Sequence, residues 1–366
     1  MLILAYALLF AQAALTGAAL TGAALRLAPR LGYLDQPGER KLHASAKPLL
    51  GGIGIFFGFW ITLWVDLWIA AALGPRLGLN AVFPVPLSNV AYALKPLGAI
   101  FAGSAMLFLL GLIDDRRPLH PGLKLVVQAL AALPLLWADV RVHGFLPAPL
   151  GAAATVLWVL FLTNAFNFMD NMDGLCGGVS AICLGIFALA SWLGREWFMA
   201  AVFLALAGAI AGFLRYNWFP SKLFMGDAGA LSIGYLIAAL SVLSTYYTSA
   251  APTPLPILAP AIILGVPIFD SLSVFAIRWR ERRPLWVGDT RHFSHRLVAL
   301  GMTRKQAVLF IYLVTATIGL CALPLRWLPM AEALVHASLI AMMFAIIGFL
   351  EAVGSADPNR NRPSGD

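Results

Sequence analysis

The sequence predicts an all-α protein that crosses a membrane many times, and three observations support this fold class. Of its 366 residues, 61% are hydrophobic and 11% are charged, whereas soluble domains carry about 25% charged residues. The mean hydropathy is +0.85. Apolar stretches of roughly 20 residues, the length of a bilayer core, recur along the whole chain. We therefore expect a polytopic membrane protein of about 10–11 transmembrane helices.

Polar segments that contain Pro and Gly divide the chain into these helices. The expected spans cover residues 2–27, 49–72, 93–113, 121–138, 149–166, 174–193, 196–214, 228–248, 255–277, 305–324 and 330–351. The first stretch has no basic leader and is longer than the apolar core of a signal peptide, so it is expected to span the membrane. Residues 1–351 are predicted to form a single multi-pass domain, and 352–366 a short disordered tail.

Lys and Arg are distributed unevenly between the two sets of loops. Of the 25 basic residues, 20 lie on one side of the expected membrane and 5 on the other. Because Lys- and Arg-rich loops stay in the cytoplasm, the N-terminus is predicted outside and the C-terminal tail inside. The net charge of +8 is then expected to set the orientation in the membrane and to attract anionic lipids and an anionic substrate. No nucleic-acid-binding motif is present in the sequence. The three scattered cysteines are typical of packing.

Five carboxylates lie at the cytoplasmic ends of the expected helices. Asp114 and Asp115 follow one helix, Asp170 and Asp173 follow another, and Asp227 precedes a third. Such residues are expensive at a membrane boundary and are typical of functional sites. The topology was assigned without them, yet all five fall on one side. The sequence therefore predicts one cytoplasm-facing active-site cleft that holds a divalent metal and a phosphorylated ligand.

Two of these segments have a distinctive pattern. From Asn164 to Asp173, Asn or Asp recurs every three residues, which gives one polar stripe on a helix. In the FMGD segment, Gly226 permits close approach of a ligand to the backbone, and Asp227 is an oxygen ligand of the kind that Mg²⁺ prefers. The alternatives are a polar stripe that joins helices, an ordinary glycine turn, and, for the Asp114–Asp115 pair, a solvated helix end.

Two basic segments on the same side favour anion binding. The late loop contains an Arg-His-Phe-Ser-His-Arg run, residues 291–296, and Arg fits phosphate oxygens bidentately. Its two His residues alone are a poor signal for zinc. The first inner loop is basic and fits lipid headgroups. Asp270 lies inside an expected span and is a functional candidate without an assigned partner.

Taken in order, these blocks resemble the polyprenyl-phosphate N-acetylhexosamine-1-phosphate transferase superfamily, the MraY/WecA-type glycosyltransferase 4 family of bacterial membrane enzymes. The resemblance rests on DxPxxRKxH, GLIDD, NxxNxxDxxDGL, FMGDxG and HxxHR and covers nearly the whole chain. It implies an enzyme of the bacterial cytoplasmic membrane that transfers a hexosamine 1-phosphate, N-acetylglucosamine 1-phosphate in the WecA-like branch, from a UDP-sugar to undecaprenyl phosphate and releases UMP. This would be the first membrane step of cell-envelope polysaccharide synthesis.

The resemblance also implies roles for individual residues. The catalytic residues would be Asp114, Asp115, Asp170 and Asp173. The nucleotide and sugar would be bound by Asn167, Asn217, Phe224 (stacked on uracil), His292, His295 and Arg296. The lipid phosphate would be bound by Arg40, Lys41, His43 and Lys47. Asp227 and Asp173 would hold the metal, Mg²⁺ or alternatively Mn²⁺. The partners would be the UDP-sugar, the polyprenyl phosphate and membrane lipids, and a homodimer is left open.

Two departures from relatives leave alternatives. Relatives specific for the muramoyl-pentapeptide nucleotide commonly carry Lys where this chain has Pro118, which favours the N-acetylglucosamine branch. Ser294 interrupts the adjacent histidines common in that branch. The alternatives are therefore a phospho-N-acetylmuramoyl-pentapeptide transferase and a lipid-phosphate transporter, and the latter class often has an internal repeat that is absent here.

Overall fold

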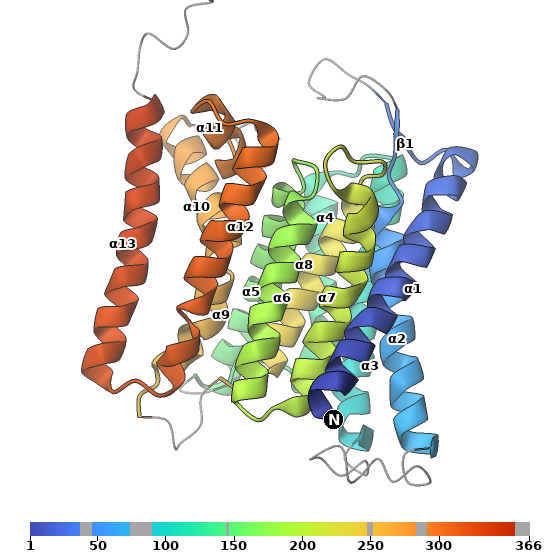
Figure 1. Ribbon diagram of the computed structural model, residues 1–366, viewed down its shortest axis with the longest axis horizontal. Helices are drawn as coiled ribbons and strands as arrows, with labels where there is room; N and C mark the ends of the chain where they lie inside the picture. Colours follow the sequence, from blue (N-terminus) through green and yellow to red (C-terminus); the bar gives the residue numbers. More distant parts are fainter. Residues whose placement is uncertain (37–45, 74–89, 144–145, 247–251, 283–290, 356–366) are drawn as a thin grey trace, which may run out of the picture. The chain divides into compact units, whose positions relative to one another are not determined.

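Helices dominate the computed structural model, which describes residues 1–36, 46–73, 90–143, 146–246, 252–282 and 291–355 (Figure 1). The one strand pairing among them is antiparallel and joins β1 (Leu34–Asp35) to β2 (Lys47–Pro48). Nine helices of these described segments are long and apolar enough to span a membrane, and a bent pair would make a tenth. The prediction of an all-α, multi-pass membrane protein is confirmed.

The chain forms two compact units, Met1–Tyr246 and Tyr247–Asp366. The first unit contains α1 (Leu2–Leu31), α2 (Gly51–Leu73), α3 (Val90–Arg116), α4 (Pro121–Trp137), α5 (Ala148–Met169), α6 (Leu175–Leu193), α7 (Trp197–Asn217) and α8 (Gly226–Leu243). The second contains η3 (Leu255–Leu258), α9 (Ala259–Ile263), α10 (Gly265–Arg280), α11 (Phe293–Ala299), α12 (Arg304–Leu320), η4 (Leu323–Arg326) and α13 (Met330–Ser355). The single domain over 1–351 stays a prediction. Most of the predicted tail, residues 356–366, lies outside the described residues.

Helix α8 lies at the centre of the first unit (Figure 1). It packs against α2, α3, α5 and α6, and 83% of its most apolar stretch is buried. Glycines make these contacts close: a Cβ on Gly111 of α3 would lie 2.3 Å from the Cα of Ala228, and a Cβ on Gly234 would lie 2.7 Å from the Cα of Thr163. Small residues allow such backbone approach in membranes. The N-terminal end of α8 is therefore held tightly against α3.

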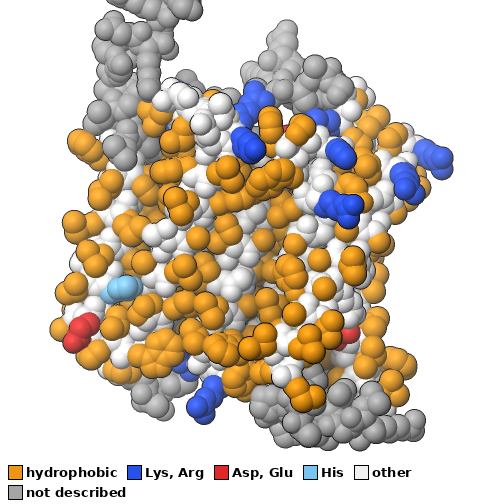
Figure 2. Space-filling model, in the orientation of Figure 1, with side chains coloured by type: hydrophobic (Ala, Val, Ile, Leu, Met, Phe, Trp, Pro, Cys, Tyr) orange, Lys and Arg blue, Asp and Glu red, His pale blue; other side chains and the backbone are white. Residues whose placement is uncertain are grey.

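The outer helices of the first unit present apolar side chains to the surroundings. On α1, Leu4, Leu8 and Leu15 are each more than 60% exposed, whereas its small residues face α7 and α2. Figure 2 shows apolar side chains over the sides of the helices, with Lys and Arg side chains near the helix ends. This distribution is the one expected of helices whose sides contact lipid and whose ends reach water.

Several helices extend further than the sequence predicts, and this places the acids in terminal turns. Helix α3 ends at Arg116 rather than 113, α5 ends at Met169 rather than 166, and α8 begins at Gly226 rather than 228. Asp114, Asp115 and Asp227 are therefore helical residues. Helix α4 has 17 residues and is shorter than the membrane-spanning helices.

The predicted continuous helix over 255–277 is wrong. The chain bends by 73° between α9 and α10, at Leu264. Pro267 explains the break, because a proline has no N–H to donate to the carbonyl four residues earlier and its ring collides with that carbonyl. The late basic loop also contains a short helix that the sequence did not predict, α11, which begins just after His292.

The contact between α3 and α8 can be tested with two glycines of the same helix. Gly111→Ala should lower the apparent Tm of the protein in detergent, because the added methyl would meet backbone atoms of Ala228 at 2.3 Å and overpacking costs on the order of 1–3 kcal/mol. Gly98→Ala is the control, since a Cβ there meets nothing within 4 Å. Equal thermal unfolding curves for the two variants would contradict the close packing.

Candidate active site

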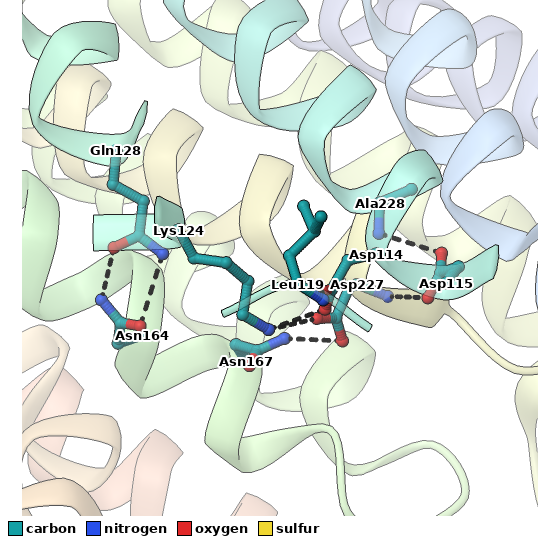
Figure 3. A network of polar contacts seen from close by, with 9 residues as sticks. All are labelled: Asp114, Asp115, Leu119, Lys124, Gln128, Asn164, Asn167, Asp227 and Ala228. Atoms are coloured by element: carbon teal, nitrogen blue, oxygen red, sulfur yellow. Dashed lines mark hydrogen bonds and ion pairs between the residues drawn. The ribbon is translucent and has the colours of Figure 1, made fainter. Parts of the chain in front are cut away.

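The first turn of α8 is capped by a carboxylate from another helix. Asp115, at the end of α3, accepts the backbone N–H of Asp227 at 2.7 Å and that of Ala228 at 3.3 Å (Figure 3). Gly226 makes this possible: its φ is +73°, and a Cβ would lie 2.5 Å from the carbonyl oxygen of Leu49 and 2.6 Å from the Asp115 carboxylate. A carboxylate at a helix N-terminus satisfies unpaired amides and the positive end of the helix dipole. The FMGD segment thus fixes the backbone position of Asp227.

The Asp227 carboxylate is held from two further helices. Its Oδ1 accepts the amide Nδ2 of Asn167 in α5 at 3.0 Å, and its Oδ2 accepts the ammonium of Lys124 in α4 at 3.1 Å. Lys124 also donates to Asp114 Oδ2 at 2.7 Å, and Asp114 Oδ1 accepts the Leu119 N–H at 2.7 Å. The ends of α3, α4, α5 and α8 therefore meet around one lysine and two carboxylates (Figure 3).

The two carboxylates on Lys124 differ in access. The side chain of Asp227 is 29% exposed, whereas that of Asp114 is 10% exposed. Both carboxylates are partly accessible, and both offset the charge of Lys124.

Asp170 adds negative charge beside this network. It directly follows the last residue of α5, and desolvation by burial raises the pKa of its carboxyl to about 7, with further contributions from the charges of Asp227 and Asp173. Burial is the largest cause of this raised pKa, and the charges of Asp227 and Asp173 add to it by repulsion. A divalent cation among these groups would relieve that repulsion.

Asp173 belongs to a second group of contacts in the same unit. Its carboxylate accepts the backbone N–H of Ser221 at 2.9 Å and the hydroxyl of Ser221 at 2.7 Å. The ammonium of Lys47 lies 3.9 Å from Asp173 Oδ2, donates to Ser221 Oγ at 2.9 Å, and lies 4.8 Å from the centre of the Phe224 ring. Lys47, which was predicted to bind lipid phosphate, thus lies beside Asp173, predicted as a catalytic and metal-binding residue, and beside Phe224, predicted to stack on uracil.

Backbone pairing brings Lys47 to this position. Phe224 donates its N–H to the carbonyl of Pro48 at 2.8 Å, and Gly51 and Gly52 donate theirs to the carbonyls of Phe224 and Met225 at 3.0 and 2.9 Å. The start of α2 is therefore hydrogen-bonded to the segment that precedes α8. The other predicted lipid-phosphate residues, Arg40, Lys41 and His43, lie outside the described residues.

Asn217 joins two loops of the site. It is 2% exposed; its side-chain oxygen accepts the N–H of Gly174 at 2.9 Å, and its side-chain nitrogen donates to the carbonyl of Leu223 at 2.9 Å. In this arrangement Asn217 positions the loops that carry Asp173 and Phe224. Its contact with a nucleotide stays a prediction.

The predicted late motif lies in the second unit. His292 Nδ1 is 2.9 Å from Asp270 Oδ2, and Asp270 Oδ1 accepts the Phe293 N–H at 2.6 Å. Both His292 and Asp270 are less than 5% exposed. Arg296 donates to the Ser273 hydroxyl at 2.8 Å, and His295 lies on α11 beside it. Asp270 therefore holds His292 and the start of α11.

The donor set around Asp227 fits a metal that takes part of its coordination from a substrate. Within the described segments, no three His, Cys, Asp or Glu side chains form a metal-binding group. Asp114 and Asp227, however, both contact one ammonium, and Mg²⁺ is typically bound by one or two carboxylates together with phosphates and water. Asp173 accepts hydrogen bonds from Ser221, and its role as a second metal ligand stays a prediction.

Sequence reasoning missed two residues of these networks, Lys124 and Ser221, and the partner of a third, Asp270. Lys124 was counted only as a basic residue, although a lysine at the start of an apolar helix near the acids is a usable signal. Asp270 was noted, but its partner His292 is 22 positions away and could not be inferred. Ser221 gave no signal, because a serine in a loop is common.

Comparison with known proteins supports one family. Residues 97–245 match the model of glycosyl transferase family 4. A protein of Bacillus subtilis, named probable undecaprenyl-phosphate N-acetylglucosaminyl 1-phosphate transferase, is 30% identical over 341 residues, which cover 90% of this chain and 85% of that protein.

Relatives from other bacteria agree. The decaprenyl-phosphate N-acetylglucosaminephosphotransferase of Mycobacterium tuberculosis is 32% identical, over 78% of this chain and 74% of its own length. The undecaprenyl-phosphate alpha-N-acetylglucosaminyl 1-phosphate transferase of Escherichia coli is 25% identical, over 80% of this chain and 77% of its own length. The chain therefore belongs to glycosyl transferase family 4 and is a multi-pass membrane enzyme.

Proposed function

We propose that the protein transfers N-acetylglucosamine 1-phosphate from UDP-N-acetylglucosamine to undecaprenyl phosphate and releases UMP. The names of the Bacillus subtilis and Escherichia coli relatives specify both the acceptor, undecaprenyl phosphate, and the transferred group, N-acetylglucosaminyl 1-phosphate. The observation that carries the proposal is the Asp114–Lys124–Asp227 network at the ends of apolar helices. A site at a bilayer edge lets the acceptor keep its polyprenyl tail in lipid while its phosphate meets a water-soluble nucleotide.

The main obstacle to this reaction is repulsion between two anions. Asp227 and Asp114 are the residues that would hold Mg²⁺, or alternatively Mn²⁺, and the ion would neutralise the donor diphosphate and the charge that develops on UMP. Asn167 and Lys124 orient Asp227 through one oxygen each. Asp115 acts indirectly, because both of its oxygens accept backbone N–H groups of α8.

The group around Asp173 is assigned to the nucleotide. The ring of Phe224 offers an aromatic face for uracil, and Asp173 and Lys47 supply an acceptor and a donor beside it. Asp170 adds to the acidic surroundings of both groups, since the charges of Asp227 and Asp173 both act on its carboxyl. Binding of the nucleotide or sugar by His292, His295 and Arg296 stays a prediction. Arg40, Lys41 and His43 are assigned to the lipid phosphate.

In this proposal the protein lies in the bacterial cytoplasmic membrane, with the N-terminus outside and the site facing the cytoplasm. The 20-to-5 distribution of basic residues supports this orientation. Two other functions are less well supported. The three relatives described above are named as transferases of N-acetylglucosamine phosphate, which favours neither alternative. A homodimer stays a prediction.

The first prediction concerns the reaction itself. Purified protein in detergent should release UMP from UDP-N-acetylglucosamine when undecaprenyl phosphate and Mg²⁺ are both present, and removal of the metal with EDTA should stop the release. Coupled enzymatic detection of UMP measures this. Release from the muramoyl-pentapeptide nucleotide alone would assign the other donor, and no release from folded protein with either nucleotide would contradict the transferase.

The second prediction concerns Asp227. Asp227→Asn should lower kcat by on the order of 100-fold or more, because a preorganised charge-stabilising group of an active site contributes about that much. The matched control is Asp139→Asn, whose carboxylate is 66% exposed and pairs with Arg141; it should keep wild-type kcat. Activity of Asp227→Asn within a few-fold of the control would remove Asp227 from the metal site.

A further inference from the structure

Two side-chain amides, one buried and one partly buried, pair with each other beside the site. Asn164 Nδ2 of α5 donates to Gln128 Oε1 of α4 at 2.6 Å, and Gln128 Nε2 donates back to Asn164 Oδ1 at a longer 3.4 Å (Figure 3). Asn164 Nδ2 also donates to the carbonyl of Leu160 at 2.7 Å. The Gln128 side chain is fully buried. A polar pair of this kind is costly in a membrane protein unless it contributes to structure or function.

The pair lies one helical turn from the two donors that hold Asp227. Gln128 follows Lys124 by four residues in α4, and Asn164 precedes Asn167 by three residues in α5. Residues at these spacings share one face of a helix. The amide pair, Lys124 and Asn167 therefore lie on the facing surfaces of α4 and α5, in two adjacent layers (Figure 3).

One side of α4 is apolar and exposed. Leu125, Val126 and Leu130 of α4 are each about half exposed, which suits contact with lipid. Between helices in a membrane, apolar packing has no hydrophobic driving force to favour one register, whereas an interhelical hydrogen bond is directional. Rotation of α4 would move the Lys124 ammonium away from the Oδ2 atoms of Asp114 and Asp227.

We propose that Gln128 and Asn164 are positioning residues for the transfer reaction. Their amide pair sets the register of α4 on α5, so that Lys124 and Asn167 contact opposite oxygens of Asp227. The inference rests on the proposed function for its kinetic readout. Loss of the pair should lower kcat because Asp227 is then oriented less well, and this effect is separate from any change in stability.

A double substitution separates positioning from stability. Gln128→Leu combined with Asn164→Leu removes both amides together, so no unpaired polar group remains and stability changes little. The apparent Tm should stay within a few degrees of wild type, and each single Leu variant should have a lower Tm than the double variant. The KM for UDP-N-acetylglucosamine should be unchanged, while kcat falls at least about tenfold, as expected for a small misplacement of reactive groups.

The exchanged pair is the rescue control. Gln128→Asn combined with Asn164→Gln keeps both amides and their summed length, so it should restore kcat to within about threefold of wild type. Gln128→Asn alone should retain the tenfold loss. Wild-type kcat in the double Leu variant, or no rescue in the exchanged pair, would overturn the inference. If the double Leu variant does not fold, the comparison of Gln128→Asn with the exchanged pair decides.

A readout without turnover separates this inference from the proposed function. Mn²⁺ binding by electron paramagnetic resonance should be several-fold weaker in the double Leu variant and restored in the exchanged pair. A wild type that binds Mn²⁺ but releases no UMP would contradict the proposed function only. Equal Mn²⁺ affinity in wild type and the double Leu variant, with equal kcat where turnover is measured, would contradict the positioning role.

Discussion

The contact between the Asp115 carboxylate and the first amides of α8 constrains the polar end of the first unit. A helix leaves its first N–H groups without partners, and these cannot remain unpaired at the edge of a membrane. Asp115 accepts two of them, which ties the last turn of α3 to the first turn of α8. Gly111 and Gly226 are required for this approach, because a Cβ on either would meet the opposing chain. The position of Asp227 follows from this contact.

Once Asp227 is fixed, the neighbouring acids take different tasks. Asp115 stabilises α8, Asp114 balances Lys124, and Asp173 is held by Ser221 near Lys47 and Phe224. The site thus divides into a group suited to a metal and phosphates and a group suited to a nucleotide base. In an apolar scaffold such acids depend on nearby donors, because like charges held close together repel one another.

The fold class and the location of the acids could be predicted from the sequence, because span length and residue hydropathy are local properties. Asp114, Asp115 and Asp227 fall at helix ends, as expected. The division of labour among them could not be predicted, since it depends on contacts between helices far apart in the chain, such as Lys124 with Asp227. The break at Leu264 was missed because the apolar run through it is continuous, although Pro267 was a usable signal.

We propose that the protein binds a divalent cation through Asp227, which Lys124, Asn167 and the start of α8 hold in place. The most direct test is Mn²⁺ titration of substrate-free protein, followed by electron paramagnetic resonance, for the wild type and for Asp227→Asn. The account predicts saturable binding to the wild type that is lost or at least about tenfold weaker in the variant. Equal Mn²⁺ affinity in the two proteins would contradict it.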